Sequence, residues 1–274
     1  MRKHVLAALK YLAVGFMALL ILVPIWDLVI NSFKSDEESR IPKLSLPSQW
    51  KGLENYQEAI VRGKVIRGFG NSVLITLSAT LVIVAVSIPA SFVFGRRKGW
   101  KVRSLFLIFM MGIITPPSFI MSLMLLRFLG LLGTYLGIIL FYSATFCAFP
   151  IFLLTGFMST IPKEIEESAV MDGASSFQVL VHFILPQLKP AIATSFIWAF
   201  LRIWNDFLIP LYLLSGNTRR YTMILGLYYL KGQWTTRWNL VFANLILVSI
   251  PVVIAYLAAQ RQIVAGLGAG AVKG

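Results

Sequence analysis

The chain has 274 residues, of which 58% are hydrophobic and only 13% are charged, and its mean hydropathy is +0.79. Soluble domains carry about 25% charged residues, so this composition excludes an ordinary soluble fold. Several apolar runs reach the length of about 20 residues that a helix needs to cross a bilayer. They lack the polar and apolar alternation of barrel strands, so the sequence predicts an all-α membrane protein.

The formal net charge of +14 raises the question of nucleic-acid binding. The basic residues lie mainly between the apolar runs, where they fix topology and meet anionic lipid headgroups. Basic and aromatic residues do not interleave as they do on single-strand-binding surfaces. We therefore expect membrane lipid, and no nucleic acid, as their partner. The only cysteine, Cys147, lies within an apolar run, which excludes an intrachain disulfide.

The first apolar run, Tyr11 to Ile30, is longer than the core of a signal peptide, and no small-x-small cleavage site follows closely, so we expect a retained helix. Apolar length predicts six transmembrane helices in all, and prolines are expected to interrupt them. Membrane helices tolerate such breaks where a neighbouring helix or a cavity satisfies the freed backbone groups. The predicted spans are Leu9–Ile30, Ser72–Phe94, Leu105–Leu126, Gly133–Phe157, Ala191–Leu214 and Leu240–Ala259, and the prolines are Pro24, Pro89, Pro116, Pro117, Pro150, Pro210 and Pro251.

Six spans place both termini on one side of the membrane. Each side carries about twelve Lys and Arg residues, so their number alone does not choose the side. The dense basic cluster from Arg96 to Arg103 occupies the shortest connection, and only Arg127 lies near the next one. This asymmetry favours a cytoplasmic location for both termini of a multi-pass protein in the cell (inner) membrane.

Two connections are long enough to have structure of their own. We accordingly divide the chain into a first helix with an outer loop (1–71), a transmembrane core (72–260) that contains a second long loop at 159–190, and a tail (261–274). The second loop lies on the side of the termini and carries the most informative residues.

This second loop begins with the pattern of a short acidic helix. Pro162 suits a first helical turn, because its missing N–H has no partner there. Glu164, Glu166 and Glu167 follow near the positive end of the helix dipole, and Gly173 suits the left-handed residue that ends a helix.

A second helix is predicted directly afterwards. Ser175 with Gln178 three residues later forms a capping-box pattern, and this helix is expected to run to Leu185, where Pro186 breaks it. The two helices are thus expected to be separate short elements joined by a turn.

The first of these helices has the character of a docking element for another protein. Ile165, Ala169 and Val170 are expected to share one apolar face beside the acidic residues. The alternative is an amphipathic helix that rests on the lipid surface, but such helices favour Lys and Arg on their polar face. The acidic composition therefore favours protein docking.

These residues resemble the EAA loop of binding-protein-dependent ABC importers. The similarity lies in Glu167-Ser168-Ala169, in Gly173 after three intervening residues, and in Leu185-Pro186. Ser168 replaces the usual second small residue, and Phe183 stands where isoleucine is common. In that family the loop is the coupling helix that fits a cleft on the cytoplasmic ATPase, which implies ATPase-coupling roles for Glu166, Glu167, Ser168, Ala169, Asp172, Gly173 and Ala174.

The resemblance extends over most of the chain and points to the carbohydrate-uptake branch of the family. It implies a type I importer fold, a second permease subunit, two ATPase subunits that hold ATP and Mg, and an extracytoplasmic solute-binding protein; the chain itself is expected to hold no cofactor. The similar segments are Asn31-Ser32-Phe33-Lys34, Asp172-Gly173-Ala174, Trp204-Asn205-Asp206 and Gly270-Ala271-Val272-Lys273-Gly274.

The fifth span contains polar residues among apolar neighbours. Ionisable groups at that depth usually face a cavity or one another, so Trp204, Asn205 and Asp206 are candidates for the substrate pathway. Arg202 and Asp206 are four residues apart on one helix face, and mutual neutralisation is the structural alternative.

The outer loop from Gly216 to Asn239 is rich in arginine, tyrosine and tryptophan, the types enriched at protein interfaces. An aromatic belt at the headgroups would have the same composition. The resemblance favours contact with the binding protein, with Tyr229 and Trp234 as the contact residues.

Other classes of function are disfavoured by what the sequence lacks. No G-x-x-x-x-G-K-[ST] phosphate loop occurs, so the chain is expected to be a transport subunit rather than an enzyme, with ATP hydrolysed by partner subunits. The two histidines, His4 and His182, form no metal or nucleophile constellation. A permease for a non-sugar solute such as glycerol phosphate stays open, and so does a secondary transporter, although we detect no repeated halves.

Overall fold

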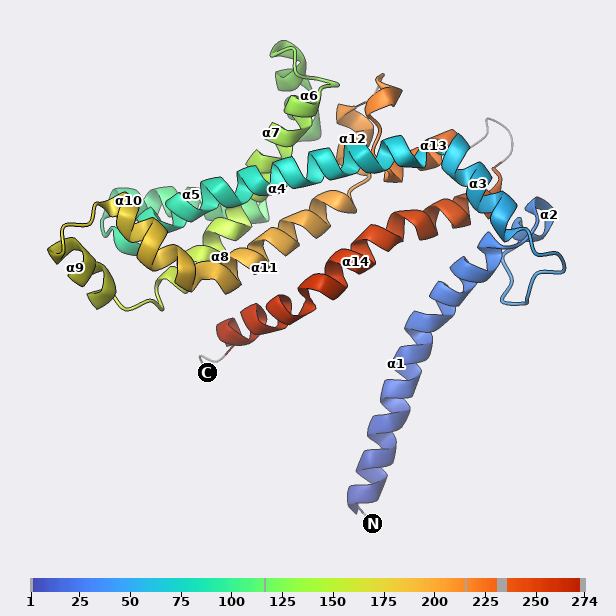
Figure 1. Cartoon of the computed structure of the whole chain (residues 1–274), viewed down its shortest axis with the longest axis horizontal. Helices are drawn as coiled ribbons and strands as arrows, with labels where there is room; N and C mark the ends of the chain where they lie inside the picture. Colours follow the sequence, from blue (N-terminus) through green and yellow to red (C-terminus); the bar gives the residue numbers. More distant parts are fainter. Residues whose placement is uncertain (1, 116, 215, 231–235, 272–274) are drawn as a thin grey trace. The chain divides into compact units, whose positions relative to one another are not determined.

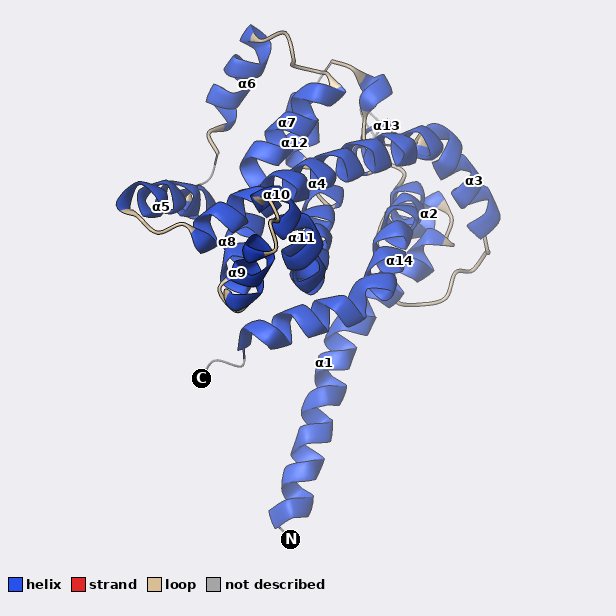
Figure 2. Ribbon diagram, turned by 60° about the vertical axis from the view of Figure 1, so that its left-hand side comes forward, coloured by secondary structure: helices blue, strands red, loops and turns tan. Residues whose placement is uncertain are grey.

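The computed structural model describes residues 2–115, 117–214, 216–230 and 236–271 (Figure 1). The regular elements of this part of the chain are helical, as Figure 2 shows. The α-helices are α1 Arg2–Ser32, α2 Asp36–Ser39, α3 Gly52–Arg62, α4 Val65–Arg96, α5 Trp100–Ile114, α6 Phe119–Phe128, α7 Tyr135–Phe146, α8 Ala148–Met158, α9 Glu164–Met171, α10 Ser176–Gln178, α11 Leu185–Trp204, α12 Leu208–Leu213, α13 Leu227–Leu230 and α14 Trp238–Ala271. A π-helix, Val179–Ile184, joins α10 to α11, and 3₁₀ turns occupy Thr218–Arg220 and Ile224–Gly226.

The helices account for six membrane spans. Four are long and apolar enough alone: Leu9–Ser32, Val65–Arg96, Ser176–Trp204 and Trp238–Leu257. The other two are bent pairs, α5 with α6 at 110° and α7 with α8 at 45°. The predicted all-α fold with six spans is therefore confirmed.

Prolines act differently in different spans. Pro117 lies at the bend between α5 and α6, and Pro150 is the third residue of α8, next to the bend at Cys147. Proline removes a backbone donor and clashes with the preceding turn, which explains bends at these points. The prediction was wrong for Pro24, Pro89 and Pro251, because α1, α4 and α14 continue through them.

The fifth span differs from the prediction at both ends. The helix does not break at Pro186 but continues from Ser176 to Trp204, and it ends well before Leu214. The π-helix explains the continuity: the N–H of Leu185 bonds the carbonyl of Leu180, five residues back, so the turn before Pro186 is already widened. Proline then occupies the start of α11, where its missing donor is tolerated.

The chain divides into two compact units, 1–69 with 222–251, and 70–221 with 252–274. We call them the outer-loop unit and the core unit. The segment 222–251, which includes α13 and the first part of α14, packs with the N-terminal residues.

The outer-loop unit is held by buried polar groups around Asn31-Ser32-Phe33-Lys34. Lys34 is only 2% exposed, and its Nζ donates to the Asn31 side chain at 3.0 Å and to the carbonyl of Lys43 at 2.6 Å. Asn55 donates to the carbonyls of Ser32 and Lys34 at 2.9 and 2.8 Å. This network closes the loop that follows α1, which gives the motif a structural role.

The core unit has two apolar clusters. The larger one gathers residues of α4, α7, α11 and α12, and α8 lies along α11 (Figure 1). The smaller one, which we call the loop cluster, lies where α8, the second long loop and the π-helix meet. Its buried members are Met158, Ile161, Ala169, Val179, Ile184 and Leu188. The second long loop is therefore packed onto the helices rather than suspended in solvent.

Candidate functional site

The acidic helix predicted in the second loop is α9, and its end is built by Gly173. This glycine has a φ of +87°, and its N–H bonds the carbonyl of Val170 at 3.0 Å. The N–H of Ala174 bonds the carbonyl of Ala169 at 2.9 Å. These two bonds form a Schellman motif, which ends the helix as the sequence predicted. A Cβ at Gly173 would meet nothing within 4 Å, so the constraint on this position is its backbone conformation.

The capping box that follows is also present. The Ser175 side chain accepts a bond from the N–H of Gln178 at 3.3 Å, and the Gln178 side chain accepts one from the N–H of Ser175 at 2.8 Å. Because both ends of this turn are fixed by local bonds, the segment from α9 to α10 has a defined shape at the ends of α8 and α11 (Figure 1).

The side chains of α9 point in two directions. Ala169 is 2% exposed and lies in the loop cluster, against which Ile165 packs. Val170 is 58% exposed and Met171 is 87% exposed. The predicted shared face is therefore correct for Ile165 and Ala169 and wrong for Val170, because one further residue rotates a side chain by about 100° on a helix.

The predicted coupling residues divide in the same way. Glu167, Ser168, Asp172 and Gly173 are exposed, whereas Ala174 is half-buried beside the loop cluster. Phe177, which the sequence analysis did not single out, is 73% exposed on α10. The loop thus presents carboxylates and large apolar side chains together, and the signal that could have identified Phe177 is its place two residues after the capping Ser175.

Glu166 is directed toward the membrane helices instead. Its carboxylate accepts a hydrogen bond from Nε of Arg96, the last residue of α4, and the two side chains are 15% and 10% exposed. Nη2 of Arg96 also donates to the carbonyl of Ile161 at 3.1 Å. The basic cluster at Arg96–Arg103 therefore supplies one residue that anchors the loop.

The second candidate region is the helix break at residues 205–207, directly after the span Ser176–Trp204. Asp206 Oδ1 accepts hydrogen bonds from the backbone N–H groups of Leu208 and Ile209 at 2.9 and 3.3 Å. Its other oxygen accepts one from the Tyr142 hydroxyl at 3.2 Å. The carboxylate therefore caps the start of α12, where the first N–H groups of a helix have no partner within the helix itself.

A cavity of about 600 Å³ opens beside this break. Arg202 lies over the rings of Phe146 and Trp198, at 5.7 and 6.0 Å from their centroids. Among the described residues no direct ion pair joins Arg202 to Asp206, and their charges interact over a longer distance. The lining comprises Pro117, Phe119, Thr145, Phe146, Trp198, Leu201, Arg202, Asn205, Asp206, Leu208 and Ile209.

The three pathway candidates have different surroundings. Asn205 and Asp206 line the cavity, and Asn205 donates to the carbonyl of Leu201 at 2.9 Å. Trp204 is 4% exposed and stacks on Phe200 with centroids 5.6 Å apart. Trp198 lines the cavity instead, and its spacing of four residues from Arg202 is a signal that could have identified it in the sequence.

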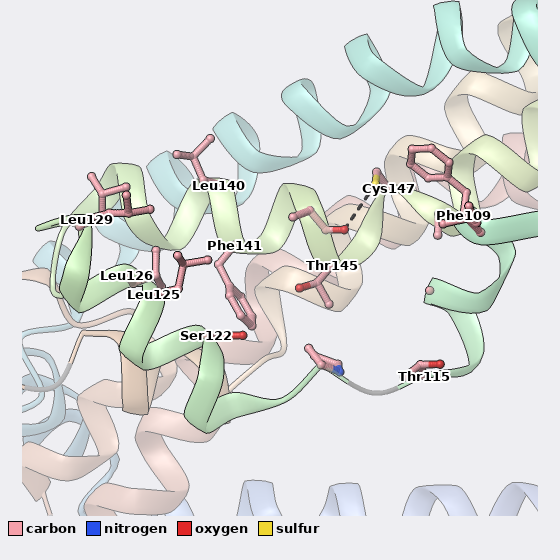
Figure 3. Close-up of a pocket in the computed structure, with 16 residues that line it drawn as sticks. Phe109, Thr115, Ser122, Leu125, Leu126, Leu129, Leu140, Phe141, Thr145 and Cys147 are labelled. Atoms are coloured by element: carbon pink, nitrogen blue, oxygen red, sulfur yellow. Dashed lines mark hydrogen bonds between the residues drawn. The ribbon is translucent and has the colours of Figure 1, made fainter. Parts of the chain in front are cut away.

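A separate groove of about 520 Å³ runs between α5, α6, α7 and α8. Figure 3 shows Leu125 of α6 and Phe141 of α7 on its walls, with Phe109 of α5 at the other end. Its lining is mostly aliphatic and aromatic, so it offers few hydrogen bonds to a polar solute. The cavity at the helix break is chemically better suited to a hydrophilic ligand.

The predicted contact residues in the outer loop have little structural description. Trp234 lies outside the described residues, and Tyr229 is described only as part of the backbone of α13. Within the described residues, no group of three or more His, Cys, Asp and Glu side chains is arranged to hold a metal ion.

Comparisons with known proteins agree with this architecture. The family model for the binding-protein-dependent transport system inner membrane component matches residues 87–267. The chain is 32% identical to the probable starch degradation products transport system permease protein of Thermoanaerobacterium thermosulfurigenes, covering 94% of this chain and 93% of that one. It is also 32% identical to the multiple sugar-binding transport system permease protein of Streptococcus mutans, covering 96% of each.

A solved structure shows the same fold. A chain from the crystal structure of a bacterial ABC transporter involved in the import of the acidic polysaccharide alginate superposes with a TM-score of 0.84 at 21% identity, covering 95% of this chain and 97% of that one. The family match covers both the loop that carries α9 and the helix break at residues 205–207. The chain is therefore a member of the binding-protein-dependent transport system inner membrane component family, the permeases of ABC importers.

Proposed function

We propose that this permease forms, with a second permease subunit, the membrane pathway of an ATP-driven importer for an oligosaccharide. The relatives that cover almost the whole chain are named for starch degradation products and for multiple sugars, which supports a carbohydrate solute. The solute is delivered by an extracytoplasmic binding protein, and both termini lie in the cytoplasm with α9.

The cavity at the helix break is the proposed contribution of this subunit to the pathway. Sugars are recognised by aromatic rings that cover their apolar faces and by charged or amide groups that bond their hydroxyls. Trp198 and Phe146 supply rings, and Arg202, Asn205 and Asp206 supply donors and acceptors on the same cavity. The pathway role of Trp204 is then indirect, through packing of the break.

The loop that carries α9 is the proposed docking site for the ATPase subunit. The observation that carries this proposal is the Schellman end of α9, which fixes an exposed tip of Glu167, Val170 and Met171 while Ala169 is buried behind it. Apolar side chains at the centre of a contact with charged residues beside them are the usual composition of a protein interface.

Co-purification and transport assays test the proposal together. A tagged chain, co-expressed with its operon partners, should recover a second permease and two copies of an ATPase. In proteoliposomes, liganded binding protein should stimulate ATP hydrolysis, and labelled maltodextrins should accumulate only with ATP.

Glu167→Lys should lower uptake by roughly tenfold through the wrong charge at the interface, whereas Glu37→Lys on exposed α2 makes the same charge change and should leave uptake intact. Uptake driven by an ion gradient without ATP would instead support a secondary transporter.

A further inference from the structure

The structure assigns a positioning role in ATP coupling to Arg96, a residue outside the docking loop: its guanidinium fixes the orientation of α9 against the end of α4. This inference rests on the proposed docking of α9 to an ATPase. It concerns how a displacement of the docked helix reaches the membrane spans.

Arg96 holds the loop at two separate points. Nε donates to the Glu166 carboxylate within α9, and Nη2 donates to the carbonyl of Ile161, which precedes α9. A planar guanidinium makes two such bonds at a fixed angle, whereas a lysine ammonium acts as a single point charge. The contact therefore fixes the direction of α9 as well as its distance from α4.

The burial of the pair distinguishes Arg96 from the neighbouring basic residues. The side chains of Arg96 and Glu166 are 10% and 15% exposed. A charge that is removed from water is strongly unfavourable when its partner is lost. The neighbouring Arg97 is exposed, and among the described residues no ion pair includes it.

The end of α4 is itself fixed against α8. Gly95 lies so close to Met158 that a Cβ at this glycine would meet the Met158 side chain at 2.7 Å. Met158 is fully buried in the loop cluster that also contains Ala169. Arg96 is thereby presented to α9 from a rigid base.

Two kinds of contact thus attach α9, and they constrain different movements. The packing of Ala169 and Ile165 in the loop cluster is apolar and non-directional, so it holds α9 in place but permits it to tilt. The bonds from Arg96 are directional and oppose that tilt. Without them, movement of a docked ATPase would rock α9 on its apolar contact instead of displacing α4.

A double-mutant cycle in the complete complex tests this role. Arg96→Gln leaves the Glu166 carboxylate unpaired, Glu166→Gln leaves the guanidinium unpaired, and the double variant leaves neither charge. We expect each single variant to lower the solute transported per ATP hydrolysed by about tenfold, with the assembled complex still recovered. The double variant should be about as impaired as either single variant, because both substitutions remove the same directional contact and their effects do not multiply. Arg97→Gln is the matched control and should have no effect.

The outcomes separate this inference from the function on which it rests. Unchanged stoichiometry in the single variants, or effects that simply multiply in the double variant, would overturn the role of Arg96. Loss of the assembled complex in both single variants would overturn it too, because the pair would then only build the loop. If Glu167→Lys uncouples transport while the Arg96 variants do not, this inference alone fails. If Glu167→Lys is also without effect, the docking assignment of α9 fails.

Discussion

Two of the helix ends in the core unit use their polar groups differently. At the turn after α9, backbone groups bond one another through the Schellman motif, so the side chains of Glu167 and Asp172 are not needed to end the helix. At the break of residues 205–207, the carboxylate of Asp206 itself bonds the N–H groups of Leu208 and Ile209. The exposed turn leaves its acidic side chains available, whereas the break commits its carboxylate to structure.

The surroundings explain this difference. Water satisfies any backbone group left over at the exposed turn, whereas at the break the first N–H groups of α12 are bonded by the Asp206 side chain. Asp206 therefore has two roles: it caps α12, and it is a candidate to contact the solute. Substitutions that keep the acceptor oxygen but remove the charge can distinguish these roles. At the exposed turn, a substitution is expected to change docking without changing assembly of the complex.

The largest effect is expected at Asp206. Asp206→Ala removes the acceptor of the backbone N–H groups of Leu208 and Ile209, and each group left unsatisfied costs about 1–3 kcal/mol. We expect both recovery of the complex and uptake to fall strongly, measured by yield after affinity purification and by transport in proteoliposomes. Asp206→Asn keeps an acceptor oxygen and should restore yield. Equal yields for the Ala and Asn variants would show that capping is unimportant here.

Gly173 provides the corresponding change at the exposed turn. Gly173→Val places a β-branched residue at a φ of +87°, which is strained by about 1–2 kcal/mol. The complex should still form, but stimulation of ATP hydrolysis by liganded binding protein should fall several-fold, because the tip of α9 loses its shape. Gly173→Asn is the control, since asparagine tolerates this conformation. A Val variant that is stimulated as fully as the Asn variant would contradict the assignment.

Trp198 tests whether the cavity beside the break contacts the solute. Trp198→Leu keeps an apolar side chain but removes the ring that stacks on Phe149, with centroids 4.3 Å apart, and lies under Arg202. We expect the concentration of solute-loaded binding protein needed for half-maximal uptake to stay constant and the maximal uptake rate to fall about threefold to tenfold, from the loss of about 1 kcal/mol. Trp100→Leu, at a residue that is 75% exposed, should change neither value.

The smallest effect is expected at the capping box. Ser175→Ala removes one side-chain acceptor at the start of α10 and should weaken local stability by about 1 kcal/mol. Hydrogen exchange of the amides of Gln178 and Val179 should accelerate about fivefold while transport remains near wild type. Ser176→Ala, one residue later, should leave exchange unchanged. Faster exchange in both variants would indicate fraying that does not depend on the cap.

The contrast between these regions also explains what the sequence could predict. Local chemistry sufficed for Gly173 and for the capping box, because the groups that bond lie within five residues of one another. The pairing of Arg96 with Glu166 joins residues 70 positions apart, and no local pattern specifies it. The prediction of a break at Pro186 was wrong because a π-helix precedes this proline, and no residue pattern in the sequence indicated the change from i−4 to i−5 hydrogen bonds. Asp206 was identified as polar within a span, but its capping role depends on where the helix breaks.

The π-helix Val179–Ile184 has a further consequence for how related sequences are compared. A π-turn holds one more residue than the α-turn that it replaces. A relative that lacks this residue would keep a continuous span, yet its side chains after the turn would be rotated by about 100° relative to a residue-by-residue match. Trp198 and Arg202 face the cavity from α11, after this turn. They can therefore be compared with positions in another family member only if that protein has the same number of residues in the turn.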